Sequence, residues 1–181
     1  MPILAEALIC LIGPIDHLPD DGVGFRQEIK HKIIEAGLKV RFFDPTNKPV
    51  GGFKEIGHEK DHAFKLRAEG RFKELKAFVH AFRRQDLRAV HVSDIVVAYV
   101  DPDVHMCGSY NEILVAEQED KPRLVVIKGG VKRCPLWLFD VFDTEHMFDT
   151  IDDLVRHLVR IDSGEVQFDP TWMKAVVFLK G

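Results

Sequence analysis

The stretch that decides the fold is "DIVVAYVDPDVHMCGSYNEILVA", residues 94–116. Residues 94–100 are almost continuously apolar, which is typical of a strand buried on both faces of a sheet. A polar loop follows, and 109–120 has the composition of a helix. Ser109-Tyr-Asn-Glu112 matches the S-x-x-E capping box, in which the glutamate side chain binds the first amide of its helix. The stretch therefore predicts strand, loop and helix, and raises the question whether Glu112 caps the helix or acts as a nucleophile.

Strands and helices alternate on both sides of this stretch. Strands are predicted at 6–13, 38–45, 94–100 and 123–129, and helices at 24–37, 69–84, 109–120 and 150–161. Less regular segments are predicted as a long loop at 45–60, a short turn starting at Asp86, and a fifth strand or extended segment at 135–142. The alternation predicts an α/β fold in a single domain, 1–162, with a parallel sheet and helices on both faces. Residues 163–181 are predicted to be an extension that packs on the domain or on a neighbouring subunit.

Composition excludes several classes of protein. The 181 residues suffice for one domain, and the net charge of −4 comes from acids and bases mixed along the chain. Clustered Lys and Arg, which would indicate a nucleic-acid polymer as partner, are not seen. No apolar run approaches the roughly 20 residues of a membrane span. The start of the chain has no signal-peptide pattern, and three cysteines at unrelated spacings indicate a reducing compartment. We expect a cytoplasmic protein that binds no membrane.

Polar residues follow three of the predicted strands. They are "GPID" at 13–16, "DP" at 44–45 and "DPDVHMCGS" at 101–109. In open parallel sheets, ligands bind outside the carboxyl ends of the strands, near the point where the strand order reverses. We therefore expect these three segments to meet in one cleft lined with carboxylates and closed by the start of a helix.

Three other motifs point to different chemistry. H-E-x-x-H at 58–62 has zinc-binding spacing on a helix, but its middle residues are charged and no third ligand follows, so we predict a solvated passage from loop to helix and no metal. Cys107 with His105 would be a thiol nucleophile at a helix start, on weak evidence. "IGPID" lacks the glycine pattern of the nucleotide phosphate loops. The five acids Asp86, Asp94, Asp101, Asp103 and Glu112 remain, and each has a structural explanation when taken alone.

The order of these elements resembles a known enzyme family. "GP" after the first strand, "DLRAVHVSDIVVAYVDPD" at 86–103 and "CGSYNEILVA" at 107–116 are similar to the nucleoside 2-deoxyribosyltransferase family, which includes related nucleoside 5′-monophosphate N-glycosidases. The resemblance covers about 6–128, and 129–162 is similar to phage-type members. It implies a flavodoxin/Rossmann-like fold, a homodimer or higher homo-oligomer, and no cofactor. The implied reaction is cleavage of the N-glycosidic bond of nucleosides or nucleotides, with a free nucleobase as acceptor.

The resemblance also implies roles for two acids. Glu112 matches the nucleophile that attacks C1′ and forms a glycosyl-enzyme intermediate, and Asp86 matches the acid that holds or protonates the base. The residues implied to bind substrate are Gly13, Pro14, Asp16, Asp44, Asp94, Met106, Gly108 and Ser109.

Met106 departs from the family pattern. Six residues before the nucleophile, transferases usually have Asp, which binds the sugar 5′-OH, and the monophosphate N-glycosidases usually have Ser, which binds phosphate. Methionine supplies neither contact. The sequence therefore leaves open a transferase, a 5′-monophosphate hydrolase, and a non-catalytic nucleotide-binding homologue in which Glu112 only caps its helix.

Overall fold

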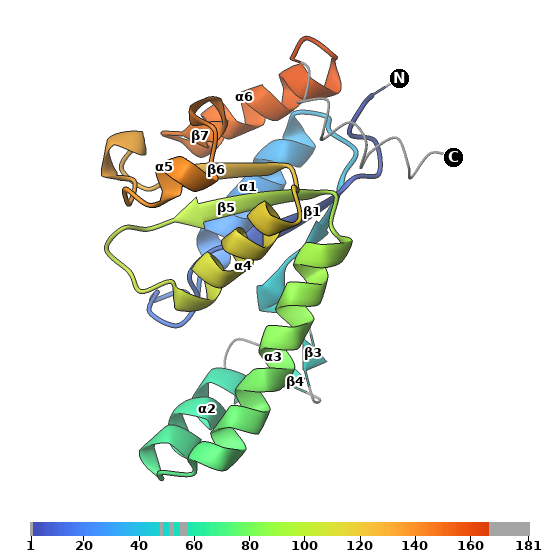
Figure 1. Cartoon of the computed structure of the whole chain (residues 1–181). Coiled ribbons are helices and arrows are strands. Elements are labelled where there is room, and N and C mark those ends of the chain that lie inside the picture. Colours follow the sequence, from blue (N-terminus) through green and yellow to red (C-terminus); the bar gives the residue numbers. More distant parts are fainter. Residues whose placement is uncertain (1, 48, 51–52, 55–57, 167–181) are drawn as a thin grey trace.

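Five parallel strands form the central sheet in the described part of the chain (Figure 1). The computed structural model describes residues 2–47, 49–50, 53–54 and 58–166. The strands lie in the order β2-β1-β5-β6-β7, and every pairing is parallel. Their bounds are β1 Leu8–Ile12, β2 Arg41–Phe43, β5 Ile95–Val100, β6 Arg123–Ile127 and β7 Met147–Phe148. Counted along the chain this is the order 2-1-3-4-5 of flavodoxin-like folds, so the predicted fold class is confirmed.

Alternate residues of each strand enter two separate hydrophobic cores, because successive side chains point to opposite faces of a sheet. Along β1, Ile9 and Leu11 lie in one core, whereas Cys10 and Ile12 lie in the other. The central strand, β5, is buried on both faces. This double burial explains why its sequence is almost continuously apolar.

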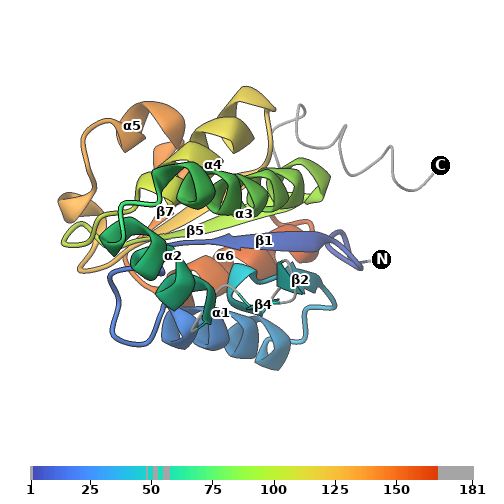
Figure 2. The ribbon, with the colours of Figure 1, turned by 90° about the horizontal axis from the view of Figure 1, so that it is seen from below.

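The helices lie in two layers, one on each side of the sheet (Figure 2). Helices α1 (Val23–Glu35) and α6 (Ile151–Asp162) cover one face. The other face is covered by α4 (Cys107–Gln118), the short α5 (Leu138–Val141) and the last turns of α3 (Phe72–Val92). Three single turns of 3-10 helix also occur, η1 Pro45–Asn47, η2 Val131–Arg133 and η3 Thr144–His146. No helix among the described residues has the length and apolar character needed to cross a bilayer.

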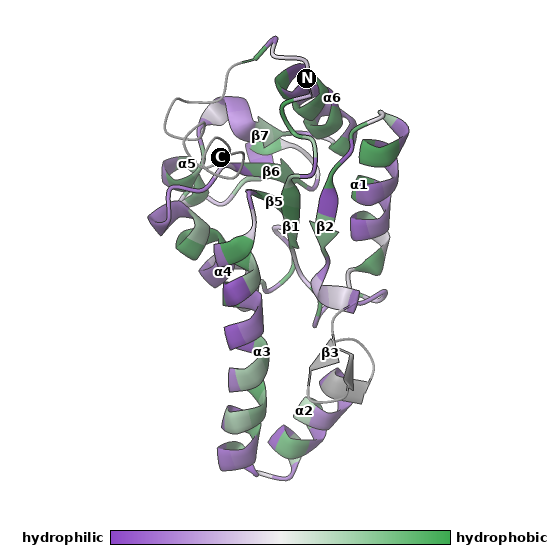
Figure 3. Ribbon diagram, turned by 90° about the vertical axis from the view of Figure 1, so that its right-hand side faces the viewer, coloured by the Kyte–Doolittle hydropathy of each residue, from purple (hydrophilic) through white to green (hydrophobic). Residues whose placement is uncertain are grey.

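One pair of helices projects beyond the sheet (Figures 1 and 3). It consists of α2 (His58–Ala68) and most of α3, and the small hairpin of β3 (Pro49–Val50) and β4 (Phe53–Lys54) lies beside it. We call residues 60–88 the arm. Leu66 is the single buried side chain in this range, whereas Phe72 is 66% exposed and Val79 is 44% exposed. The apolar residues of the helix predicted at 69–84 therefore do not join either core.

The course of α3 corrects one prediction. A turn is predicted at Asp86, but the helix continues to Val92. No glycine or proline interrupts residues 85–92, and Ala89 and Val90 are buried in the core beneath α4, so helix is favoured through the whole stretch. This continuation places Asp86 inside a helix that joins the arm to the sheet.

Two further segments differ from the prediction. Residues 135–142 contain helix α5 and no strand, because Leu138 and Val141 are buried at helical spacing while Leu136 and Trp137 remain exposed. The fifth strand is β7, Met147–Phe148. The predicted loop at 45–60 contains η1, β3, β4 and the start of α2. Residues 167–181 of the predicted extension lie outside the described range, and its packing stays a prediction.

Candidate active site

Two adjoining cavities open at the carboxyl edge of the sheet, where β1 and β5 lie side by side and the strand order reverses. The large chamber, of about 630 Å³, lies among α2, α3 and α4. The small chamber, of about 180 Å³, lies against the segments that follow β1 and β5. Five residues line both chambers and form their junction: Asp16, Asp86, Cys107, Gly108 and Glu112.

The two predicted catalytic acids reach this junction from different helices. Asp86 comes from α3 and Glu112 from α4, and both side chains are half-buried. The helices are joined beside the junction by a hydrogen bond of 3.2 Å from Arg83 Nη2 to Asn111 Oδ1. The packing of α3 on α4 thus brings together two carboxylates that are far apart in the sequence.

The start of α4 corrects the predicted capping box. The helix begins at Cys107, two residues before the prediction, and its N-cap residue is Met106, with no side-chain cap hydrogen bond. The amide of Tyr110 donates to the carbonyl of Met106 at 2.9 Å, which closes the first turn. Ser109 is therefore a buried residue inside the helix, and Glu112 lies in the second turn. Glu112 is therefore not at a position where its side chain could cap the start of α4.

The turn after β1 requires glycine at its first position. A Cβ atom on Gly13 would lie 2.4 Å from Cζ of Phe25 and 3.1 Å from the carbonyl oxygen of Tyr99. The rings of Phe25 and Tyr99 are stacked, with centroids 4.4 Å apart, so neither has room to move away. Gly13 therefore lets the chain pass tightly over the core before it forms the wall of the small chamber.

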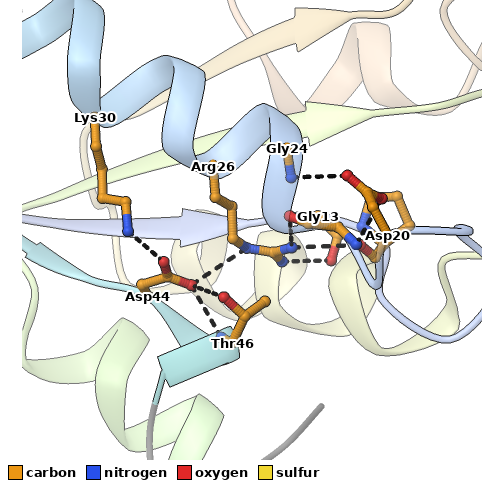
Figure 4. A network of polar contacts seen from close by, with 9 residues as sticks. Gly13, Asp20, Gly24, Arg26, Lys30, Asp44 and Thr46 are labelled. Carbon is orange, nitrogen blue, oxygen red and sulfur yellow. Dashed lines mark hydrogen bonds and ion pairs between the residues drawn. The ribbon is translucent and has the colours of Figure 1, made fainter. Parts of the chain in front are cut away.

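A buried arginine holds this turn in place (Figure 4). Arg26 on α1 is 0% exposed and lines the small chamber. Its guanidinium donates to the carbonyls of Gly13 at 2.8 Å, Gly22 at 2.9 Å and Pro14 at 3.4 Å. A buried cation needs such partners, and they tie both ends of the β1–α1 loop to one side chain.

Two carboxylates support the same loop. Asp44 lies 3.8 Å from Nε of Arg26 and accepts from Nζ of Lys30 at 2.6 Å (Figure 4). Burial acts to raise the pKa of Asp44, but the contacts with Lys30 and with Thr46 outweigh it and hold that pKa below its usual value. Asp20 accepts the amides of Gly24 at 2.8 Å and Gly22 at 3.1 Å, and these donors lower the pKa of Asp20.

The loop after β5 is also held by ion pairs. Asp101 is buried and accepts from Nζ of Lys128 at 2.6 Å, and Asp103 binds Arg133 through both of its oxygens at 2.8 and 2.9 Å. The hydrogen bond with Asp101 raises the pKa of Lys128. Met106 is 3% exposed, and its Sδ accepts the Asp101 amide at 3.4 Å. These contacts indicate that Asp101 and Asp103 have a structural role, which is to position the start of α4.

The structure brings eight of the ten predicted site residues to the two chambers. They are Gly13, Pro14, Asp16, Asp86, Met106, Gly108, Ser109 and Glu112. Asp44 and Asp94 do not line either chamber. Asp94 precedes β5 at the opposite edge of the sheet, where its Oδ2 accepts the Leu8 amide at 2.7 Å, and its substrate-binding role stays a prediction. Asp44 acts on the site through Arg26.

Several lining residues were not predicted from the sequence. In the large chamber these include Lys60, Phe64, Phe82, Arg83 and Asn111, and in the small chamber His17 and Arg26. Phe82 is one of the apolar residues at helical spacing in 69–84, and such spacing cannot distinguish a core from a cavity. His17 directly follows "GPID" and was visible as a polar residue at a strand end.

The alternative motifs have ordinary surroundings. The H-E-x-x-H stretch lies in the first turns of α2, so it is helical where a passage from loop to helix was predicted. Within the described range, no group of three His, Cys, Asp or Glu side chains is arranged to hold a metal ion. Cys107 is exposed at the junction of the chambers, and Cys10 and Cys134 are buried.

Comparisons with known proteins give a likeness in fold. No protein-family model matches the chain, and no curated protein matches it in sequence. Among solved structures, the fold is similar to that of a 2-deoxyribosyltransferase from the psychrotolerant bacterium Bacillus psychrosaccharolyticus. The two chains are 15% identical, the TM-score is 0.56, and the match covers 82% of this chain and 90% of the other. At this identity the likeness shows a shared fold.

Proposed function

We propose that the protein cleaves the N-glycosidic bond of 2-deoxynucleosides or their nucleotides and transfers the 2-deoxyribosyl group to another base. The observation that carries the proposal is the position of Asp86 and Glu112, both of which line the junction between a mostly apolar chamber and a polar one. The shared fold with a protein named as a 2-deoxyribosyltransferase supports it. The reaction that we propose needs only these side chains and no cofactor.

The chemistry divides one difficult step into two. The Glu112 carboxylate attacks C1′ and forms an ester, while the C1′–N bond breaks and its electron pair goes to the base nitrogen. Asp86 shares or supplies the proton that this nitrogen takes up. A second base then attacks C1′, its ring nitrogen gives up its proton to Asp86, and Glu112 leaves as the carboxylate. If water attacks in place of the second base, the outcome is hydrolysis.

The lining of the large chamber suits a nucleobase. Phe64 and Phe82 supply aromatic surface, and Arg83, Asn111 and Lys60 supply hydrogen-bond donors at its edge. Ligand sites commonly combine an apolar lining with a few polar groups that fix the orientation of the ligand. With the base in this chamber, C1′ of the sugar would lie at the junction beside both acids.

The test is substitution of the proposed nucleophile. Glu112→Gln keeps the size and most of the hydrogen bonding of the side chain but cannot form the ester. We expect release of free base from the four common 2-deoxynucleosides and their 5′-monophosphates, followed by chromatography, to fall by about a thousandfold or more. Glu117→Gln, a half-buried residue of the same helix, is the matched control and should leave the rate within about twofold. Equal rates for Glu112→Gln and the native chain would refute the proposal.

Two further measurements define the reaction. Mass spectrometry of acid-quenched enzyme should detect a deoxyribosyl adduct on the peptide that contains Glu112. Base release measured with and without a free acceptor base separates transfer from hydrolysis, because hydrolysis needs no acceptor.

The homodimer or larger oligomer that we also propose is measured by light scattering of the purified chain.

A further inference from the structure

Acidic and basic groups are distributed unevenly along the cleft. Among the described residues, the three carboxylates that line it, Asp16, Asp86 and Glu112, belong to the junction of the two chambers. Beyond the junction, the described lining of the small chamber contains no carboxylate. It does contain three side chains able to carry positive charge, His17, Arg26 and His105. The end of the cleft away from the large chamber therefore has the character of an anion site.

Two histidines from different loops meet in this chamber. His17 follows the turn after β1, and His105 precedes α4. Their ring centroids lie 5.9 Å apart at an interplanar angle of 65°, and both side chains are exposed. A group held between them would receive hydrogen bonds from two directions.

The other candidates for this contact are occupied. The guanidinium of Arg26 donates to three backbone carbonyls, so it adds positive charge to the chamber wall while its N–H groups hold the turn. Met106 also lines the chamber, but it is buried with its sulfur on the Asp101 amide. The exposed polar side chains of the chamber beyond the junction are thus the two histidines.

We propose that the small chamber binds the 5′-phosphate of a 2-deoxynucleoside 5′-monophosphate, with His17 and His105 as the residues that determine this specificity. The proposal rests on the proposed function, since a sugar with C1′ at the junction and its base in the large chamber directs its 5′ end into the small one. A phosphate monoester carries a charge of about −1.5 to −2 near neutral pH. Two imidazoles can donate hydrogen bonds to the phosphate oxygens, and the buried Arg26 cation adds positive charge beside them. A 5′-hydroxyl carries no charge that this cation could attract.

The first experiment compares substrates that differ only in the phosphate. We expect kcat/KM of the native chain to be at least tenfold higher for the 5′-monophosphates than for the matching 2-deoxynucleosides. The doubly substituted chain, His17→Gln with His105→Gln, should reduce this ratio at least tenfold, and each single substitution should reduce it less. His31→Gln, at an exposed histidine on α1 outside the cleft, is the matched control and should keep the native ratio. A native ratio near one, or an unchanged ratio in the double variant, overturns the inference.

The second experiment measures binding without turnover. Calorimetry with the Glu112→Gln chain should show tighter binding of the monophosphate than of the nucleoside, and the added histidine substitutions should remove the difference. Equal binding of both ligands overturns the inference whether or not the native chain is active. Cleavage of nucleosides without a preference for monophosphates would leave the proposed function intact and reject the phosphate site. Absence of cleavage together with preferential monophosphate binding would reject the reaction and support the site.

Discussion

The two walls of the cleft are built in different ways. On the sheet side, the turn after β1 and the loop after β5 are held by buried charged groups, Arg26 and Asp101, over two hydrophobic cores. On the other side, the arm at 60–88 has Leu66 as its single buried side chain. An ion pair between Lys60 and Asp21 joins the arm to the β1–α1 loop.

Charge differs between the walls as well. The arm has nine Lys and Arg against four Asp and Glu, although the whole chain has a net charge of −4. Many side chains of this helix pair are therefore charged and solvated, and few of them are buried. The proposed nucleophile Glu112 therefore lies on the well-packed wall, whereas the proposed acid Asp86 and much of the apolar chamber proposed for the base belong to the weakly packed arm. Weakly packed elements open locally at lower free energy than a core does.

The largest expected effect tests the rigid wall. Arg26→Met should lower the free energy of unfolding by about 3 kcal/mol or more, because it leaves three buried carbonyls without their donor and removes one of the two cations beside Asp44. Urea unfolding followed by circular dichroism measures this loss. Arg84→Met, at an exposed residue of the arm, should change stability by less than about 0.5 kcal/mol. Similar losses in both variants would contradict the difference between the walls.

A pair of glycines lining the cleft tests the same wall at smaller scale. Gly13→Ala should cost about 2 kcal/mol, because its Cβ would overlap the Phe25 ring. At Gly108, inside α4, a Cβ meets nothing within 4 Å, so Gly108→Ala should stabilise the fold by about 0.5 kcal/mol. Thermal unfolding of the two variants should therefore shift in opposite directions. A stable Gly13→Ala chain would mean that the turn has more room than its geometry indicates.

A substitution in the arm should affect substrate binding more than it affects the stability of the fold. Phe82 is half-buried and lines the large chamber, with its ring in edge contact with Phe78 at 4.6 Å. Phe82→Ala should cost only about 1 kcal/mol of stability, yet raise KM about tenfold through lost base contacts. Phe72→Ala is the control on the same helix, since that ring is 66% exposed and lies outside the chamber. Equal KM values for both variants would mean that Phe82 of the arm does not contribute to binding of the base.

The smallest expected effect is a dependence of the free energy of unfolding on pH. The pKa of Asp44 is lowered in the folded state, so its ion pairs contribute stability above the unfolded value of 3.8. This contribution is lost as the pH falls from 3.8 through the lower folded pKa. Urea titrations between pH 6 and pH 3 measure the free energy of unfolding of the native chain and of Asp44→Asn. The difference between the two chains should become smaller below pH 3.8. A difference that stays constant down to pH 3 would contradict the assigned shift.

Much of the fold was predictable from local pattern. Continuous apolar runs identified β1, β5 and β6, and helical spacing identified α1 and α6, because each signal depends on residues close in the sequence. Errors occurred where distant contacts decide the outcome. The packing of Ala89 and Val90 extends α3, and the burial of Met106 starts α4 early.

The site shows the same division between local pattern and distant contacts. The sequence by itself determined the alternation of strands and helices, and its resemblance to a known family implied the candidates Asp86 and Glu112. Only the tertiary structure decided that these acids share a junction, that Asp94 lies at the far edge, and that Arg26 holds the Gly13 turn. It also brought His17 and His105 together across the small chamber. The physical reason is that periodicity reports which face of an element is apolar, whereas the meeting of two loops depends on how the whole sheet brings its strand ends together.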